Sequence, residues 1–64
     1  MITTRQADKL IAAGKPVRMT DTHGVTGVVT FIARDRRHVE YRDETGHVGK
    51  MDRGYIATAE ECAP

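Results

Sequence analysis

The chain has 64 residues, a formal net charge of +1 and 39% hydrophobic residues. A chain this short makes one small domain, because it buries only about 60% of its unfolded surface on folding. No run approaches the ~18 apolar residues of a membrane span, and we expect no signal peptide at the N-terminus. The single cysteine, Cys62, excludes a disulfide framework within the chain and indicates a reducing compartment, so we expect a cytoplasmic protein.

A short helix is predicted over residues 3–14. Thr3 or Thr4 can cap its first turn, and Gly14 is a natural C-terminal stop. Its apolar residues recur at three- and four-residue spacings, which place them on one face: Ala7, Leu10 and Ile11. We expect this face to plug one open end of the β-structure that follows. The alternative is a docking face for a partner helix or a second copy.

After the helix the apolar period becomes alternating, which predicts short strands at a spacing of about ten residues. The expected strands cover residues 17–20, 27–33, 38–42 and 47–51, followed by an apolar pair, Tyr55 and Ile56. The turns at 21–24 and 43–46 each run from Asp to Gly, as tight turns do. The strand over 27–33 is apolar on both faces, so we expect it to be central, longest and most bent. Residues 57–61 are expected to form a single helical turn or a frayed end.

The stretch GVTGVVTFI, residues 24–32, resembles the KOW motif. Two glycines three apart, Gly24 and Gly27, are followed by the apolar residues Val29 and Ile32. The continuation RHVEYRDETG, residues 37–46, looks like the paired strands of KOW and Tudor-type domains. The resemblance spans about residues 15–56.

The resemblance implies an SH3-like barrel. The whole prediction is one domain over residues 1–64: a mainly β fold with a helix at 3–14, a small five-stranded antiparallel barrel at 15–57 and a tail at 58–64. The two glycines would let a strand bend from one part of the barrel into the next. KOW domains contact RNA or protein, whereas Tudor-type domains bind methylated side chains through an aromatic cage. The three aromatic residues here, Phe31, Tyr41 and Tyr55, are too few for such a cage, because Phe31 is expected in the core.

A burst of arginines at the turn over residues 34–37 is the main candidate site. The candidate nucleic-acid-binding residues are Arg34, Arg36, Arg37, Arg42, Lys50 and Arg53. Guanidinium groups suit phosphate because they offer planar, paired donors. These residues predict a module that contacts RNA or DNA. The alternative is a solvated hairpin tip, since acidic residues lie among the bases: Asp35, Glu40, Asp43 and Glu44.

Other chemistry finds little support in the sequence. The spacing of the histidines at 23, 38 and 47 matches no zinc signature, serine is absent, and no phosphate-binding loop is present. We therefore expect no metal, no cofactor and no catalysis.

Type II dihydrofolate reductases are SH3-like barrels that build one active pore from four subunits, so an oligomeric enzyme stays a remote alternative, although their Val-Gln-Ile-Tyr stretch is missing here. A protein-interaction module, or a small accessory regulator of the phage or plasmid type, is the nearer alternative. The sequence leaves the oligomeric state open.

Overall fold

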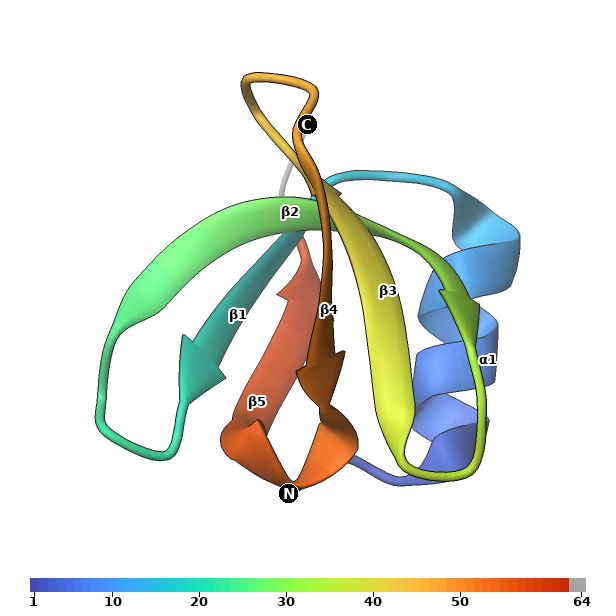
Figure 1. The fold of residues 1–64 in the computed structure, drawn as a ribbon, viewed down its shortest axis with the longest axis vertical. Coiled ribbons are helices and arrows are strands. Elements are labelled where there is room, and N and C mark those ends of the chain that lie inside the picture. The colour runs from blue at the N-terminus through green and yellow to red at the C-terminus, as the bar shows by residue number, and fades with distance from the viewer. Residues whose placement is uncertain (63–64) are drawn as a thin grey trace.

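The structure is a computed structural model that describes residues 1–62 (Figure 1). In chain order its elements are α1 (Thr4–Ala13), β1 (Val17–Asp21), β2 (Thr26–Arg34), β3 (His38–Asp43), β4 (Val48–Asp52), the 3₁₀ helix η1 (Arg53–Tyr55) and β5 (Ile56–Glu61). The five strands form one antiparallel sheet in the order β4-β3-β2-β1-β5. The predicted mainly β fold with an N-terminal helix is therefore confirmed.

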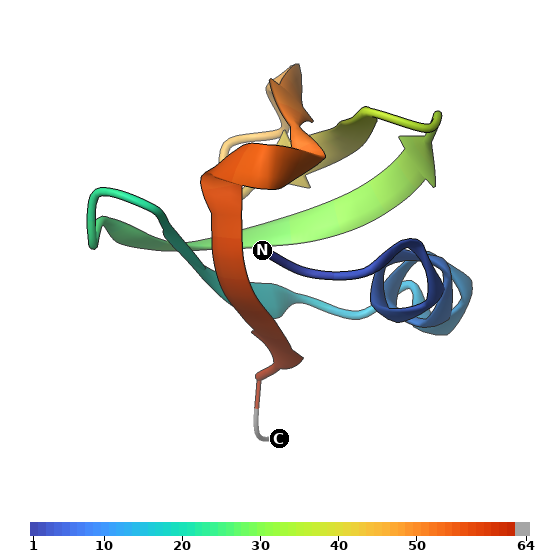
Figure 2. The same cartoon turned by 90° about the horizontal axis from the view of Figure 1, so that it is seen from below.

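The sheet curls around its interior, as Figures 1 and 2 show, and α1 lies beside its concave side. Within residues 1–62 no hydrogen-bonded ladder joins the two edge strands, β4 and β5, so the structure is barrel-like without closure. The longest strand, β2, occupies the centre of the sheet, as its apolar composition predicts. No helix in the described part of the chain is long and apolar enough to cross a membrane.

The N-terminal helix is fixed at both ends. Its first turn carries a capping box: the Thr3 hydroxyl accepts from the Gln6 backbone N–H at 3.1 Å, and the Thr3 N–H donates to the Gln6 side chain at 2.8 Å. The helix ends at Gly14, which adopts the left-handed conformation with φ of 63°. Ala7 and Leu10 are buried in the same cluster as the strand residues, so the apolar face packs into the end of the sheet.

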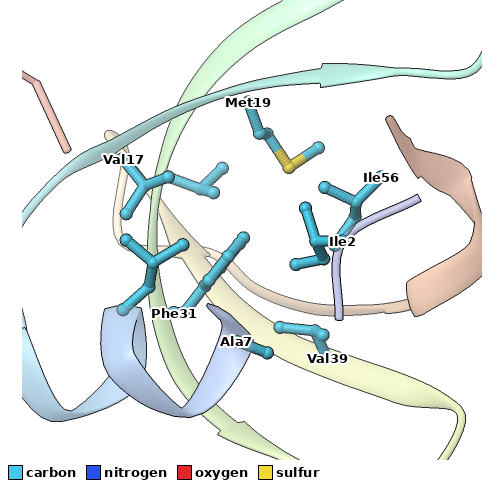
Figure 3. Packing of buried hydrophobic residues seen from close by; sticks show 9 residues of the cluster. Ile2, Ala7, Val17, Met19, Phe31, Val39 and Ile56 are labelled. Atoms are coloured by element: carbon cyan, nitrogen blue, oxygen red, sulfur yellow. The ribbon is translucent and has the colours of Figure 1, made fainter. Parts of the chain in front are cut away.

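The core combines the helix face with alternate residues of the strands. Its members are Ile2, Ala7, Leu10, Val17, Met19, Val29, Phe31, Val39 and Ile56, and Figure 3 shows them converging between the strands and α1. Phe31 is the largest of the fully buried side chains and is 1% exposed. Alternation places Val17 with Met19 and Val29 with Phe31 on the inner face, because successive strand residues point to opposite sides.

Of the two glycines in the KOW-like stretch, only one has the expected mechanical role. Gly24 closes the β1–β2 turn with φ of 84°, and its N–H donates to the Asp21 carbonyl at 3.0 Å. Gly27 does not have a positive φ and pairs with Met19 in the ladder. A Cβ built on Gly27 would meet no atom within 4 Å, so this position does not require glycine.

The irregularities that bend the sheet lie elsewhere. The register between β2 and β3 shifts between Phe31 and Ala33, which leaves Ile32 without a Cα partner. A second shift occurs between Thr20 and Asp21, where β1 faces β5. Because a bulge bends its strand and increases the local twist, these two positions account for the curl that was expected from Gly27.

The predicted tail from residue 58 is wrong for the residues that the structure describes. Residues 58–61 belong to β5, which pairs with β1 through partners such as Thr20 with Thr58 and Val17 with Glu61. The Cys62 N–H extends the ladder by donating to the Pro16 carbonyl at 3.0 Å. Backbone pairing with a distant strand overrides the weak local pattern of Ala, Thr and Glu. The last two residues of the predicted tail, 63–64, lie outside the described residues.

Candidate nucleic-acid interface

The β2–β3 turn is organised by one carboxylate. Asp35 Oδ1 accepts from the backbone N–H groups of Arg37 at 2.8 Å and His38 at 2.7 Å. These two N–H groups hold the pKa of Asp35 far below its ordinary value of 3.8. Asp35 Oδ2 lies 3.5 Å from Lys50 Nζ. The acid at this turn is therefore committed to shaping the backbone, while Arg36 and Arg37 remain exposed on it.

The Arg34 side chain does not contribute to an exposed basic surface, because it joins the helix to the sheet. Its Nε donates to Asp8 Oδ1 at 2.5 Å and its Nη2 donates to Asp8 Oδ2 at 2.8 Å. This two-pronged pair lowers the pKa of Asp8, with the hydrogen bond from Arg34 as the largest cause. The Arg34 side chain is 25% exposed and lies at the junction of α1 and β2. It acts as a structural clamp.

Arg53 is also structural. Its Nη1 donates to the Ile2 carbonyl at 2.7 Å, and its backbone N–H donates to the Arg37 carbonyl at 2.6 Å. Its Nε is buried and has no hydrogen-bond partner within residues 1–62. The Ile2 N–H in turn donates to the Ile56 carbonyl at 3.0 Å. Arg53 therefore ties the N-terminal segment to the corner between β4 and β5.

The outer face of β3 and β4 carries alternating charges. Glu40 stands opposite Lys50, and His38 stands opposite Asp52. Arg42 is exposed on the same face, two residues after Glu40. It lies near the end of β3 that is farther from the β2–β3 turn, residues 35–37, which we call the arginine turn. The six predicted bases therefore do not form one basic face, and the structure keeps Arg36 and Arg37 together as an adjacent exposed pair.

Three chain segments form one continuous end of the molecule, which we name the turn rim. The turn rim consists of residues 22–25, η1 and residues 35–37, all at the lower end of Figure 1. The Thr22 N–H donates to the Tyr55 carbonyl at 3.0 Å, which joins the first turn to η1. The Arg53 N–H donates to the Arg37 carbonyl, which joins η1 to the arginine turn. Backbone hydrogen bonds thus connect the three segments to one another.

Aspartates next to the rim serve the backbone in the same way as Asp35. Asp21 Oδ1 accepts from the N–H groups of His23 at 2.8 Å and Val25 at 3.0 Å. Asp52 Oδ1 accepts from the Gly54 N–H at 2.8 Å and so caps η1. Acids and bases are interleaved in sequence here, yet they have different roles: the acids accept from backbone N–H groups, that of Arg37 included, whereas the side chains of Arg36 and Arg37 form no ion pair within residues 1–62.

The rim also carries an aromatic pair that the sequence reasoning missed. The rings of His23 and Tyr55 lie 6.5 Å apart between centroids with an angle of 53° between their planes. Tyr55 is 56% exposed and Val25 is 64% exposed. In the sequence Tyr55 and Ile56 form only an apolar pair, which does not indicate that Ile56 is buried while Tyr55, the last residue of η1, is exposed.

A groove lies away from the rim, between α1 and β5. It has a volume of about 440 Å³ and is lined by Gln6, Lys9, Leu10, Ala59 and Glu61. Within residues 1–62 no group of three or more His, Cys, Asp or Glu side chains is placed to hold a metal ion.

Comparison with known proteins gives no further guide to the site. No protein-family model matches the chain, and no curated protein matches it significantly.

Proposed function

We propose that the protein is a non-catalytic binding module that contacts RNA or DNA phosphates through Arg36 and Arg37. The observation that carries this proposal is the exposed arginine pair on a turn whose shape is fixed by Asp35. Neither arginine has an ion-pair partner within residues 1–62. The resemblance of residues 24–32 to the KOW motif adds support, because KOW domains contact RNA or protein.

A preformed turn favours phosphate binding because little backbone freedom is lost when the ligand arrives. Each guanidinium can donate two parallel hydrogen bonds to a phosphate. A net charge of +1 gives little long-range attraction, so the affinity must come from local contacts. We expect weak binding, with a dissociation constant of about 10⁻⁴ to 10⁻⁶ M, as for sequence-independent contacts to phosphate.

Salt dependence of binding tests the proposal. A labelled oligonucleotide is titrated with protein at salt concentrations from about 50 to 200 mM, and affinity is read by fluorescence anisotropy. The double variant Arg36→Ala/Arg37→Ala should bind more weakly and lose about 1.4 to 1.8 from the slope of log affinity against log salt, because each phosphate contact contributes about 0.7 to 0.9.

A matched control separates local contacts from net charge. Arg5 in α1 and Arg18 in β1 are both exposed and lie outside the turn rim, so Arg5→Ala/Arg18→Ala removes the same charge. The control should keep the slope of the parent protein. Equal losses in both double variants, or no binding to RNA or DNA by the parent protein, would overturn the proposal.

A protein-interaction role is the second candidate, and the groove between α1 and β5 favours it. This groove combines an apolar floor at Leu10 and Ala59 with charged walls at Lys9 and Glu61. Lys9→Glu would invert one wall, so it should weaken a protein ligand without changing the salt slope for nucleic acid. A Lys9→Glu variant that loses nucleic-acid binding to the same extent as the rim variant would count against both assignments.

A further inference from the structure

The turn rim offers more than two arginines. We infer that it binds single-stranded nucleic acid, with one base stacked on Tyr55 and the neighbouring phosphates at Arg36 and Arg37. This inference rests on the proposed function and names its substrate class. Four observations carry it: the exposure of Tyr55, the hydrogen bonds that hold the backbone of η1, the nearby ring of His23, and the hydrogen bond that joins η1 to the arginine turn.

The Tyr55 side chain is exposed to solvent and is not packed into the core. Tyr55 is 56% exposed, whereas the next residue, Ile56, is fully buried. The Tyr55 hydroxyl makes no hydrogen bond within residues 1–62, so no polar contact in the described chain accounts for the position of the ring. The aromatic ring recorded near it is that of His23, with 6.5 Å between the ring centroids and a tilt of 53°. A tilted neighbour at this distance leaves area for a second flat group.

Hydrogen bonds hold the backbone that carries Tyr55, which matters because a stacking surface that moves must be ordered by its ligand. The backbone of η1 is held by the Asp52 cap on the Gly54 N–H. The Tyr55 carbonyl accepts from the Thr22 N–H on one side. The Arg53 N–H donates to the Arg37 carbonyl on the other side. Tyr55 and the arginine turn are thus parts of one hydrogen-bonded unit.

This combination distinguishes single strands from duplexes. Bases of a duplex are stacked on each other and do not present their faces to a protein surface, whereas a single strand can place a base on an aromatic ring. Arginine side chains beside such a ring bind the phosphates that flank the base. A rim with arginines alone would bind both forms through phosphate, so Tyr55 is the residue that should create a preference for single strands.

The test measures binding of oligothymidylate and of a duplex of the same length by anisotropy, with the parent protein and three variants. Tyr55→Phe keeps the ring and is the matched control. Tyr55→Leu keeps apolar volume without the ring, and Tyr55→Ala removes both. Leu and Ala at this position should each weaken single-strand binding by about 5- to 150-fold, the equivalent of about 1 to 3 kcal/mol for one stacked base. Duplex binding should stay unchanged in all three variants.

A spectroscopic readout tests the stacking directly. The chain contains two tyrosines and no tryptophan. In a Tyr41→Phe background all tyrosine fluorescence therefore comes from Tyr55, and oligothymidylate should quench it. Quenching that is absent at saturating ligand would overturn the stacking assignment.

The outcomes separate this inference from the proposed function. Salt-dependent binding that requires Arg36 and Arg37 but is unchanged in Tyr55→Ala would leave the phosphate proposal standing and overturn the stacking inference. Absence of binding to both single strands and duplexes would overturn both. Circular dichroism checks the fold of each variant, and we expect Tyr55→Leu to fold like the parent protein because Tyr55 is exposed.

Discussion

Position 49 in β4 should require glycine because a larger residue would collide with a neighbouring side chain. Its backbone conformation does not itself require glycine. Gly49 pairs with Tyr41 across β3 and β4. A Cβ built on Gly49 would lie 2.5 Å from the Tyr41 hydroxyl oxygen and 2.6 Å from the adjacent ring carbon, Cζ. Non-bonded carbon atoms prefer about 3.5 to 4.0 Å, so the Tyr41 ring must move by about 1 Å or more in Gly49→Ala. Tyr41 packs against the core, and this movement disturbs that packing.

The magnitude follows from a comparison with Gly27→Ala. Both substitutions replace a strand glycine without a positive φ, so both gain about 0.4 to 1 kcal/mol from a less flexible unfolded chain. Only Gly49→Ala adds an overpacking cost of about 1 to 3 kcal/mol. The difference between the two variants in free energy of unfolding should therefore be about 1 to 3 kcal/mol. A domain of 64 residues has a total stability of roughly 3 to 10 kcal/mol, so the effect is readily measured.

The assay is urea and thermal unfolding followed by circular dichroism. One kcal/mol corresponds to about 4 to 8 °C in Tm for a domain of this size. A second background, Tyr41→Val, removes the ring, and there Gly49→Ala should behave like Gly27→Ala. Equal stability of Gly49→Ala and Gly27→Ala in the parent background would show that the Tyr41 ring does not restrict position 49, as would an equal loss from Gly49→Ala with and without that ring.

Further predictions concern residues that hold the rim and the helix. Because the folded state lowers the pKa of Asp35, the stability that its charge contributes is present above the ordinary pKa of 3.8 and is lost as pH falls below it. Asp35→Asn should therefore reduce the loss of unfolding free energy as the pH falls below 3.8, as measured by urea unfolding at several pH values. Arg53→Ala should lower the free energy of unfolding by about 1.5 to 3 kcal/mol, the usual value for a hydrogen bond to a charged group, without changing the salt slope of nucleic-acid binding. Arg34→Ala should likewise lower Tm and leave the slope unchanged, and a reduced slope in either variant would return that arginine to the interface.

Much of the fold can be read from local patterns. The helix follows from a threonine cap at Thr3 or Thr4, its apolar spacing and its stop at Gly14, and the structure places the cap at Thr3 and the stop at Gly14. The turn at 43–46 follows from its Asp-to-Gly chemistry, and the Gly46 N–H does donate to the Asp43 carbonyl at 3.1 Å. Such features depend on neighbours within four residues, so a sequence carries them directly.

The features that sequence reasoning missed depend on distant partners. Arg34 binds Asp8, which lies 26 residues away, and Arg53 binds the Ile2 carbonyl, 51 residues away. No local pattern distinguishes these two arginines from exposed ones. The bulge near Ile32 was hidden because β2 is apolar on both faces, so a one-residue shift leaves no break in the alternation.

The central claim is that the turn rim is the surface that meets nucleic acid. A titration of isotopically labelled protein with oligothymidylate, followed by two-dimensional NMR of the backbone amides, tests it most directly. We expect the largest shifts in residues 22–25, 35–37 and 53–55, with little change at Gln6, Lys9 and Ala59 in the groove. Shifts centred on the groove, or no shifts at any ligand concentration, would contradict it.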